Sequence, residues 1–299
     1  MTRILDRYGP DLAALRGPAL LDAIREAEGR TVLAEVIASA PPLLTGTANA
    51  ELVAAFGADL ICCNLVDPAA EGVLVTGLEE LDPPPAGFGG LARLLGRPVG
   101  CNLEPDLPSV PRAVRGTASA GRAAVSNGAA FVIVTANPGR GAGLADLVRT
   151  VRTLTEAEPG LVVLAGKMHQ AGAEETIGPH TAEALVAAGA DGVLVPVPGT
   201  VPGVSETTAR ETVVAARAAG AVAVSTIGTS QEGADLTTIR TLALTAKRIG
   251  ADVHHIGDAG WTGVASPDVI HAYSVAIRGV RHTWNRMARG TRASWRGAP

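Results

Sequence analysis

The chain has 299 residues and a net charge of −4, with 47% hydrophobic and only 18% charged residues. This composition can bury a large core, and the acidic balance argues against nucleic acid as a partner. Because the sequence has no run of about 18 apolar residues and no signal-peptide pattern, we expect a cytoplasmic protein without a membrane partner.

The segment before the first predicted strand has a helical pattern. Residues 11–30 read "DLAALRGPALLDAIREAEGR", and we assign residues 1–30 to an N-terminal helical extension. Eight apolar runs then follow at a spacing of about 30 to 40 residues, with helical patterns between them. They predict strands near residues 31–38, 58–64, 97–103, 129–135, 161–166, 190–196, 221–226 and 251–256.

A rough internal repeat supports this division. In "AAFGADLICCN" (54–64) and "VSNGAAFVIVTAN" (125–137), a helical segment ends at a glycine and an apolar run follows. Continuous apolar runs of this length are typical of parallel strands that are covered on both sides. Eight βα units predict a closed (β/α)8 barrel, a TIM barrel, as one domain over residues 1–299. The alternative is an open doubly wound sheet, but the first βα loop lacks a GxGxxG turn.

The two ends of the chain and the cysteines complete the organisation. The N-terminal extension should cover the bottom of the barrel, and residues 280–299 should form a basic, solvated C-terminal tail or a subunit contact. Cys62, Cys63 and Cys101 lie in apolar strand-like runs, and adjacent residues on a strand point to opposite faces. We therefore expect small core residues and no disulfide framework.

In a TIM barrel the reactive groups lie at the C-terminal ends of the strands. The fifth strand ends in Lys167 and His169, which should face the same way. The sequence has only one other lysine, Lys247, and otherwise uses arginine. A lysine can lose its proton and form a Schiff base or act as an acid or base, whereas an arginine cannot. The alternatives are that Lys167 binds a substrate anion or pairs with a carboxylate.

Acidic and histidine side chains at other strand ends are further catalytic candidates. Glu35, Glu104 and Asp258 could move protons, and of the adjacent pair His254 and His255 only one can enter the barrel; we favour His255. The leading hypothesis needs no cofactor. The alternative is Mg²⁺ or another divalent metal, with Glu35, Glu104 and Asp67 as the ligands.

The loops after the sixth, seventh and eighth strands combine glycines with threonine and serine. Such loops let backbone N–H groups approach an anion, and this end of the barrel is a frequent phosphate site. The predicted substrate-binding or phosphate-binding residues are Asn102, Asn137, Arg140, Thr200, Gly228, Thr229, Ser230, Gly257 and Gly260.

Several motifs together are similar to a known family. "GRPVGCNLEP", "AGKMHQAG", "IGTSQEGAD" and "HHIGDAG" resemble a bacterial family of barrel enzymes loosely labelled phosphoenolpyruvate-phosphonomutase-like. The resemblance covers nearly the whole chain and implies the barrel, but it assigns no catalytic role to any residue.

The sequence therefore predicts an aldolase-like lyase or isomerase that acts on a small phosphorylated carbonyl metabolite, such as a sugar phosphate. Lys167 would be the Schiff-base or acid–base residue. One alternative is a metal-dependent lyase or mutase for a keto acid or phosphonate, and another is a barrel that binds a ligand without catalysis. We also expect a homo-oligomer.

Overall fold

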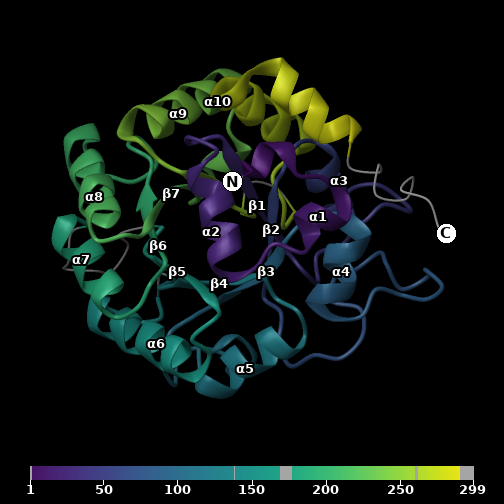
Figure 1. Cartoon of the computed structure of the whole chain (residues 1–299), viewed down its shortest axis with the longest axis horizontal. Helices are drawn as coiled ribbons and strands as arrows, with labels where there is room; N and C mark the ends of the chain where they lie inside the picture. Colours follow the sequence, from purple (N-terminus) through teal and green to yellow (C-terminus); the bar gives the residue numbers. More distant parts are fainter. Residues whose placement is uncertain (1, 138, 169–176, 260–261, 290–299) are drawn as a thin grey trace.

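The protein is a closed barrel of eight parallel strands, arranged in the order of the sequence (Figure 1). The computed structural model describes residues 2–137, 139–168, 177–259 and 262–289. The predicted TIM barrel is confirmed, and every predicted strand lies within a few residues of an observed one. The strands are β1 (Thr31–Ile37), β2 (Leu60–Asn64), β3 (Val99–Leu103), β4 (Phe131–Thr135), β5 (Val162–Gly166), β6 (Gly192–Pro196), β7 (Val222–Ile227) and β8 (Val253–Ile256).

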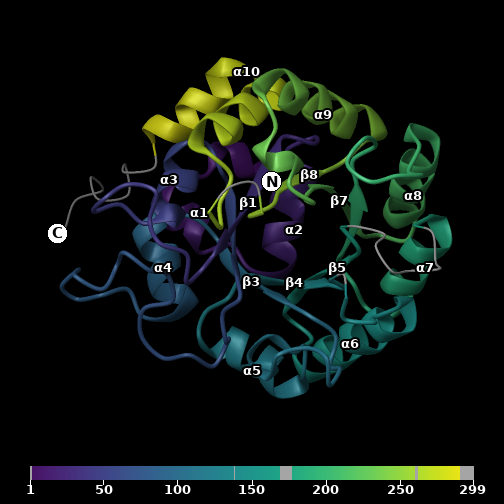
Figure 2. The same ribbon diagram turned by 180° about the vertical axis from the view of Figure 1, so that it is seen from behind.

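Helices α3 to α10 form a ring around the barrel, and α1 and α2 lie across one of its ends (Figures 1 and 2). The helices are α1 (Gly9–Ala13), α2 (Gly17–Arg25), α3 (Asn49–Ala55), α4 (Gly87–Leu95), α5 (Ala118–Ser126), α6 (Leu144–Ala157), α7 (Pro179–Ala187), α8 (Glu206–Ala218), α9 (Leu236–Ile249) and α10 (Pro267–Ala288). Short 3₁₀ turns are η1 (Ile4–Asp6), η2 (Arg112–Val114) and η3 (Gln231–Gly233). Within the described residues, none of the helices combines the length and hydrophobicity needed to span a bilayer.

The strand residues divide into two buried clusters because successive side chains point to opposite faces. One set, which includes Val32, Ile61 and Val132, packs outward against the surrounding helices. The other set, which includes Leu33 and Ile133, fills the barrel and joins the apolar residues of the N-terminal segment. The N-terminal extension therefore closes the bottom of the barrel, as the sequence predicted.

Glycines inside the barrel make room for its largest side chains. A Cβ atom at Gly100 would lie 2.6 Å from the Phe131 ring, and one at Gly192 would lie 2.5 Å from Leu164. Both large side chains belong to the interior cluster. Small and large residues thus alternate between neighbouring strands, which fills the barrel as a core rather than leaving a pore.

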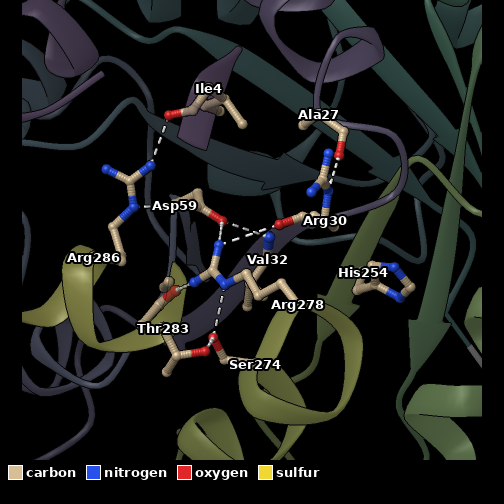
Figure 3. Close-up of polar contacts among 12 residues, drawn as sticks. Ile4, Ala27, Arg30, Val32, Asp59, His254, Ser274, Arg278, Thr283 and Arg286 are labelled. Carbon is tan, nitrogen blue, oxygen red and sulfur yellow. Dashed lines mark hydrogen bonds and ion pairs between the residues drawn. The ribbon is translucent and has the colours of Figure 1, made fainter. Parts of the chain in front are cut away.

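The C-terminal region differs from the expected tail. Residues 280–288 are part of α10, which is kinked at Gly279. Of the predicted tail, residues 290–299 lie outside the described residues. Two of its arginines are buried against Asp59, with Arg278 Nη1 and Arg286 Nε 2.5 and 2.6 Å from the carboxylate oxygens (Figure 3). Residues 280–288 therefore do not form the expected solvated tail: they are helical, and Arg286 among them finds a buried partner at the barrel bottom, although Arg281 is exposed.

The cysteine prediction is confirmed. Cys62, Cys63 and Cys101 are all free and buried. Cys62 belongs to the interior cluster, whereas Cys63 and Cys101 belong to the outer one.

Candidate active site at the barrel mouth

Glu35 and His255 form a buried pair inside the barrel. Their strands are neighbours, and Glu35 Oε2 lies 3.1 Å from His255 Nε2, with side chains 2% and 0% exposed. The two atoms are close enough for an ion pair but are not aligned as a hydrogen bond. Neither ring nitrogen of His255 has a hydrogen-bond partner among the described residues. Cys62 Sγ lies on the other side of the carboxylate, 3.9 Å from Glu35 Oε1.

His254 points away from the barrel interior. Its Nε2 lies 3.0 Å from the Gly29 carbonyl oxygen, and its Nδ1 lies 3.2 Å from the Tyr273 hydroxyl. Burial lowers the pKa of His254 to about 4. His254 therefore serves as a neutral, hydrogen-bonded part of the packing between β8 and α10, and His255 alone lies in the site.

A chain of hydrogen bonds crosses the mouth from β8 to β4. The Asn64 amide donates to Asp258 Oδ2 at 2.9 Å, the Asn102 amide donates to Asn64 Oδ1 at 3.2 Å, and the Thr135 hydroxyl donates to Asn102 Oδ1 at 3.0 Å. Burial and the charge of Glu35 raise the pKa of Asp258 to about 7, although the hydrogen bond from Asn64 opposes the rise. Asp258 can therefore exchange a proton near neutral pH.

Lys167 directly follows the last paired residue of β5. Its side chain is buried, and its Nζ has no hydrogen-bond partner among the described residues. The next residue, Met168, packs into the interior cluster. His169, which we expected to share the face of Lys167, lies outside the described residues.

Glu104 and Arg140 form a second pair at the mouth. Arg140 Nε lies 3.4 Å from the buried Glu104 Oε2, and Arg140 also donates to the Ser109 carbonyl oxygen at 3.0 Å. The contact with Glu104 is an ion pair without hydrogen-bond geometry, so Glu104 Oε2 too has no hydrogen-bond partner in the described part of the chain. Asn137 is half-buried in the same loop as Arg140.

Asp67 does not join these groups. It is exposed, and its carboxylate accepts a hydrogen bond from the Ala69 amide at 2.9 Å. Across the described residues, no group of three or more His, Cys, Asp or Glu side chains is arranged to hold a metal ion. The described part of the chain therefore does not bring the predicted ligand set of Glu35, Glu104 and Asp67 together.

Two of the three hydroxyl groups predicted to bind phosphate, those of Thr200 and Thr229, are engaged within the protein. Thr200 Oγ1 donates to the Val197 carbonyl oxygen at 2.8 Å, and Thr229 Oγ1 lies 2.6 Å from the Gly228 carbonyl oxygen. The Gly257 N–H donates to the Ile227 carbonyl oxygen at 2.9 Å and is equally occupied.

The backbone N–H groups of the loop after β7 differ from these donors in their hydrogen bonding. The N–H groups of Gly228, Thr229 and Ser230 donate to no acceptor within the described part of the chain. Thr229 and Ser230 both have left-handed backbones, with φ of 60° and 74°. Non-glycine residues in this conformation are strained and concentrate at functional sites. The backbone of this loop thus offers anion donors, whereas the Thr200 and Thr229 hydroxyls and the Gly257 N–H are already used. Gly260 lies outside the described residues.

Sequence reasoning missed two residues of the mouth, Glu232 and Thr226. Glu232 lies in η3 and is 0% exposed; its Oε1 accepts a hydrogen bond from the Ala259 N–H at 2.8 Å. Burial raises the pKa of Glu232. Thr226 pairs with His255 in the sheet register and is fully buried. The signal for Glu232 was the acidic residue inside the glycine-rich "IGTSQEGAD", and for Thr226 it was a polar residue near the end of an apolar strand.

Unsatisfied polar atoms concentrate at this end of the barrel. Eight buried side-chain N or O atoms lack a hydrogen-bond partner within the described residues, and six of them lie here. Native proteins leave few such atoms, so each one requires an explanation. The six are Glu104 Oε2, Lys167 Nζ, Thr226 Oγ1, Glu232 Oε2, His255 Nδ1 and His255 Nε2.

Comparison with known proteins places this fold among familiar barrels. Residues 5–293 match the family model described as "Domain of unknown function (DUF7916)". No curated protein sequence matches the chain. The match gives no support to the phosphoenolpyruvate-phosphonomutase-like label that the motifs suggested.

Solved structures share the barrel at low sequence identity. A Schiff-base-forming fructose-1,6-bisphosphate aldolase superposes with a TM-score of 0.53 at 15% identity, covering 83% of this chain and 94% of its own. A proposed fructose-1,6-bisphosphate aldolase from Coccidioides immitis has a TM-score of 0.51 at 13% identity, over 95% and 100% of the two chains. A Rubisco-like protein from Rhodopseudomonas palustris has a TM-score of 0.50 at 19% identity, over 88% and 69%. At these identities the likeness shows an aldolase-like TIM-barrel fold and nothing finer.

Proposed function

This chain belongs to the family described as "Domain of unknown function (DUF7916)", and we propose that it is an aldolase-like lyase or isomerase. The substrate would be a small phosphorylated carbonyl compound such as a sugar phosphate. The observation that carries this proposal is a set of six buried polar atoms at the barrel mouth that have no hydrogen-bond partner within the described residues; they include an amine, two carboxylate oxygens and an imidazole. Such atoms favour a site that a ligand completes.

Lys167 is the proposed amine of the reaction. A buried lysine without a described hydrogen-bond partner can approach a substrate carbonyl, because no ion pair has to break first. Attack of the amine on the carbonyl carbon and loss of water would give an imine, which withdraws electrons from the neighbouring carbon–carbon or carbon–hydrogen bond. Alternatively, Lys167 would donate a proton to the carbonyl oxygen and take it back.

Asp258 and the Glu35–His255 pair would move the protons. Asp258 has a pKa of about 7 and is therefore both ionised and protonated in useful amounts near neutral pH. The hydrogen bond from Asn64 fixes the orientation of its carboxylate. Glu35, 3.1 Å from His255, would orient the imidazole and stabilise its charged form when it accepts a proton.

The free N–H groups of Gly228, Thr229 and Ser230 would hold the phosphate. This loop follows β7, the region in which TIM barrels frequently bind phosphate. A cluster of backbone donors favours an anion without requiring a positively charged side chain. Asn102, Asn137 and Arg140 on the opposite side of the mouth would then contact the remaining polar groups of the substrate.

Reductive trapping tests the proposal, and the sequence makes the assay unusually clean because it contains only Lys167 and Lys247. The protein is incubated with a panel of sugar phosphates and borohydride, and intact-mass and peptide analysis locate any adduct. We expect an adduct on Lys167 that is lost in Lys167→Met. Lys247→Met is the matched control, since Lys247 is exposed on α9 and donates to the Ile277 carbonyl oxygen.

Each other outcome has a defined meaning. Turnover that requires Lys167 but gives no adduct supports the acid–base role. Activity abolished by chelation and restored by Mg²⁺ or another divalent metal replaces the proposal with a metal-dependent lyase or mutase. Full activity or ligand response in Lys167→Met refutes the role of this residue. The expected homo-oligomer is likewise a proposal, tested by light scattering.

A further inference from the structure

We propose that Glu232 is a positioning residue that fixes the loop after β8 and thereby sets the location and surroundings of Asp258. Nothing in the motif pattern or the comparisons assigns a role to this residue. The inference deepens the proposed function and rests on it in one respect, the assignment of Asp258 as the proton-transfer group.

The geometry places the Glu232 carboxylate against the backbone of the β8 loop. Its Oε1 accepts a hydrogen bond from the N–H of Ala259, the residue after Asp258, at 2.8 Å. On the other side of Asp258, a Cβ atom at Gly257 would lie 2.9 Å from the same oxygen and 3.0 Å from the Ile227 carbonyl oxygen. A side chain at residue 257 would therefore crowd the Glu232 carboxylate, which lies beside the loop backbone before Asp258 and is hydrogen-bonded to it after Asp258.

Asn64 holds Asp258 from the opposite direction. Its amide donates to Asp258 Oδ2 at 2.9 Å from the end of β2. Glu232 thus fixes the backbone of the loop and Asn64 fixes the carboxylate of Asp258. Removing either contact should loosen one of these two constraints and leave the other in place.

Four groups decide the electrostatic environment of Asp258. Burial and the negative charge of Glu35 on β1 raise its pKa, and Glu232 in η3 adds to this increase, whereas the Asn64 hydrogen bond and His255 on β8 oppose it. A carboxylate added only to support the loop would not need its charge. The neutral amide oxygen of a glutamine could accept the same hydrogen bond from the Ala259 N–H, so the two roles of Glu232 can be separated by mutation.

The second carboxylate oxygen of Glu232 is the independent observation that connects it to the site. Oε2 is buried and has no hydrogen-bond partner within the described residues, although the side chain is 0% exposed. If the carboxylate served only to accept the hydrogen bond from Ala259, burying its second oxygen without a partner would cost free energy with no gain. This oxygen is available to a donor group of a ligand.

The test titrates Asp258 directly and needs no substrate. Aspartate labelled with ¹³C at the carboxyl carbon is incorporated, and the resonance that disappears in Asp258→Asn identifies Asp258. We expect a lower titration midpoint in Glu232→Gln than in the wild type, because the amide keeps an acceptor oxygen for Ala259 but carries no charge. Glu206→Gln, on the exposed face of α8, is the matched control and should leave the midpoint unchanged.

Hydrogen exchange of the Ala259 amide reads out the positioning role. It should stay protected in Glu232→Gln and exchange faster in Glu232→Ala. Gly257→Ala, which displaces the carboxylate without removing it, should also accelerate exchange. An unchanged Asp258 midpoint in Glu232→Gln together with unchanged exchange in Glu232→Ala would overturn the proposal. A failed trapping experiment would overturn the lyase assignment but would not alter either of these two readouts.

Discussion

The two ends of this barrel treat buried polar groups in opposite ways. At the bottom, Asp59 is 0% exposed and lies between Arg278 and Arg286, and its second oxygen also accepts the Val32 N–H at 2.8 Å (Figure 3). At the mouth, the buried carboxylates of Glu104 and Glu232 each leave one oxygen without a hydrogen-bond partner among the residues that the structure describes. Burial alone therefore does not identify a functional group. Buried polar atoms without a partner among the described residues are concentrated at the mouth, which holds six of the eight, whereas Arg7 Nε and Thr31 Oγ1 lie at the bottom.

The bottom network also holds distant parts of the chain together. Arg286 on α10 donates to the carbonyl oxygens of Ile4 and Arg7, each at 2.7 Å. Arg97, which precedes β3, donates to the carbonyl oxygen of Ala58 at 2.8 Å and to that of Arg286 at 3.3 Å. Burial lowers the pKa of Arg97 to about 9. The N-terminal segment, α10 and two strands are thus joined by groups whose hydrogen bonds are satisfied.

The largest expected effect comes from Asp258→Asn at the mouth. Loss of a proton-transfer group lowers turnover by about 10²- to 10⁴-fold. As a base, Asp258 must be ionised, so the wild-type rate should rise as the pH passes about 7, and this limb should be absent from the mutant. The measurement is a pH–rate profile with the carbonyl substrate that the trapping screen identifies.

The same mutation should stabilise the fold, in contrast to the mutation of a buried carboxylate at the bottom of the barrel. The folded-state pKa of Asp258 is raised, so the stability linked to its protonation is lost as the pH rises through about 7. Asp258→Asn should therefore have the higher free energy of unfolding at pH 8. A destabilised, inactive mutant would mean that Asp258 is a structural residue.

Asp59→Asn should give the largest loss of stability. Removing one partner of a buried ion pair costs about 3–5 kcal/mol, because the arginines are left buried without their counter-charge. The nearby arginines lower the pKa of Asp59, so its stabilising contribution is present above the unfolded-state pKa and is lost as the pH falls below it. Urea unfolding at pH 7 measures the effect. Glu206→Gln, which removes an exposed ion pair with Arg248, should leave the transition unchanged.

His254, the histidine of the pair that lies outside the site, should make the stability of the fold sensitive to acid. Because burial lowers the His254 pKa from 6.5 to about 4, the unfolded chain takes up a proton first as the pH falls. Its contribution to the free energy of unfolding should decline by roughly 3 kcal/mol between these two values. Urea titrations at pH 7 and pH 4.5 should show this decline in the wild type and a smaller one in His254→Gln. An equal decline in both proteins would contradict the assignment.

The smallest expected effect is the difference in stability between variants of two buried threonines. Thr212 on α8 donates to the Thr208 carbonyl oxygen at 2.8 Å, whereas the Thr226 hydroxyl at the mouth has no partner among the described residues. Thr212→Val should cost about 1 kcal/mol, and Thr226→Val should be neutral or stabilising, because it removes an unsatisfied group. Thermal unfolding of both variants measures the difference. Equal destabilisation would show that Thr226 has a structural partner.

The fold could be predicted because its signals are local. Each strand is a continuous apolar run, and several of the preceding helices end at a glycine, so periodicity and spacing were enough to count eight βα units. The rule that chemistry lies at the C-terminal ends of strands then selected Glu35, His255 and Asp258, which the structure brings together. The expectation of a solvated tail failed over residues 280–288 because the sequence does not reveal that Arg286 pairs with the distant, buried Asp59.

The sequence by itself therefore determined the barrel and the end at which polar residues gather, because these depend on the spacing of apolar runs and on the direction of parallel strands. Only the tertiary structure decided which polar groups are satisfied. Arg286 reaches Asp59 across 227 positions of the chain, and Glu232 turns back from its loop onto Ala259. Contacts of this kind depend on how separate elements pack in space, and no local pattern of residues encodes them.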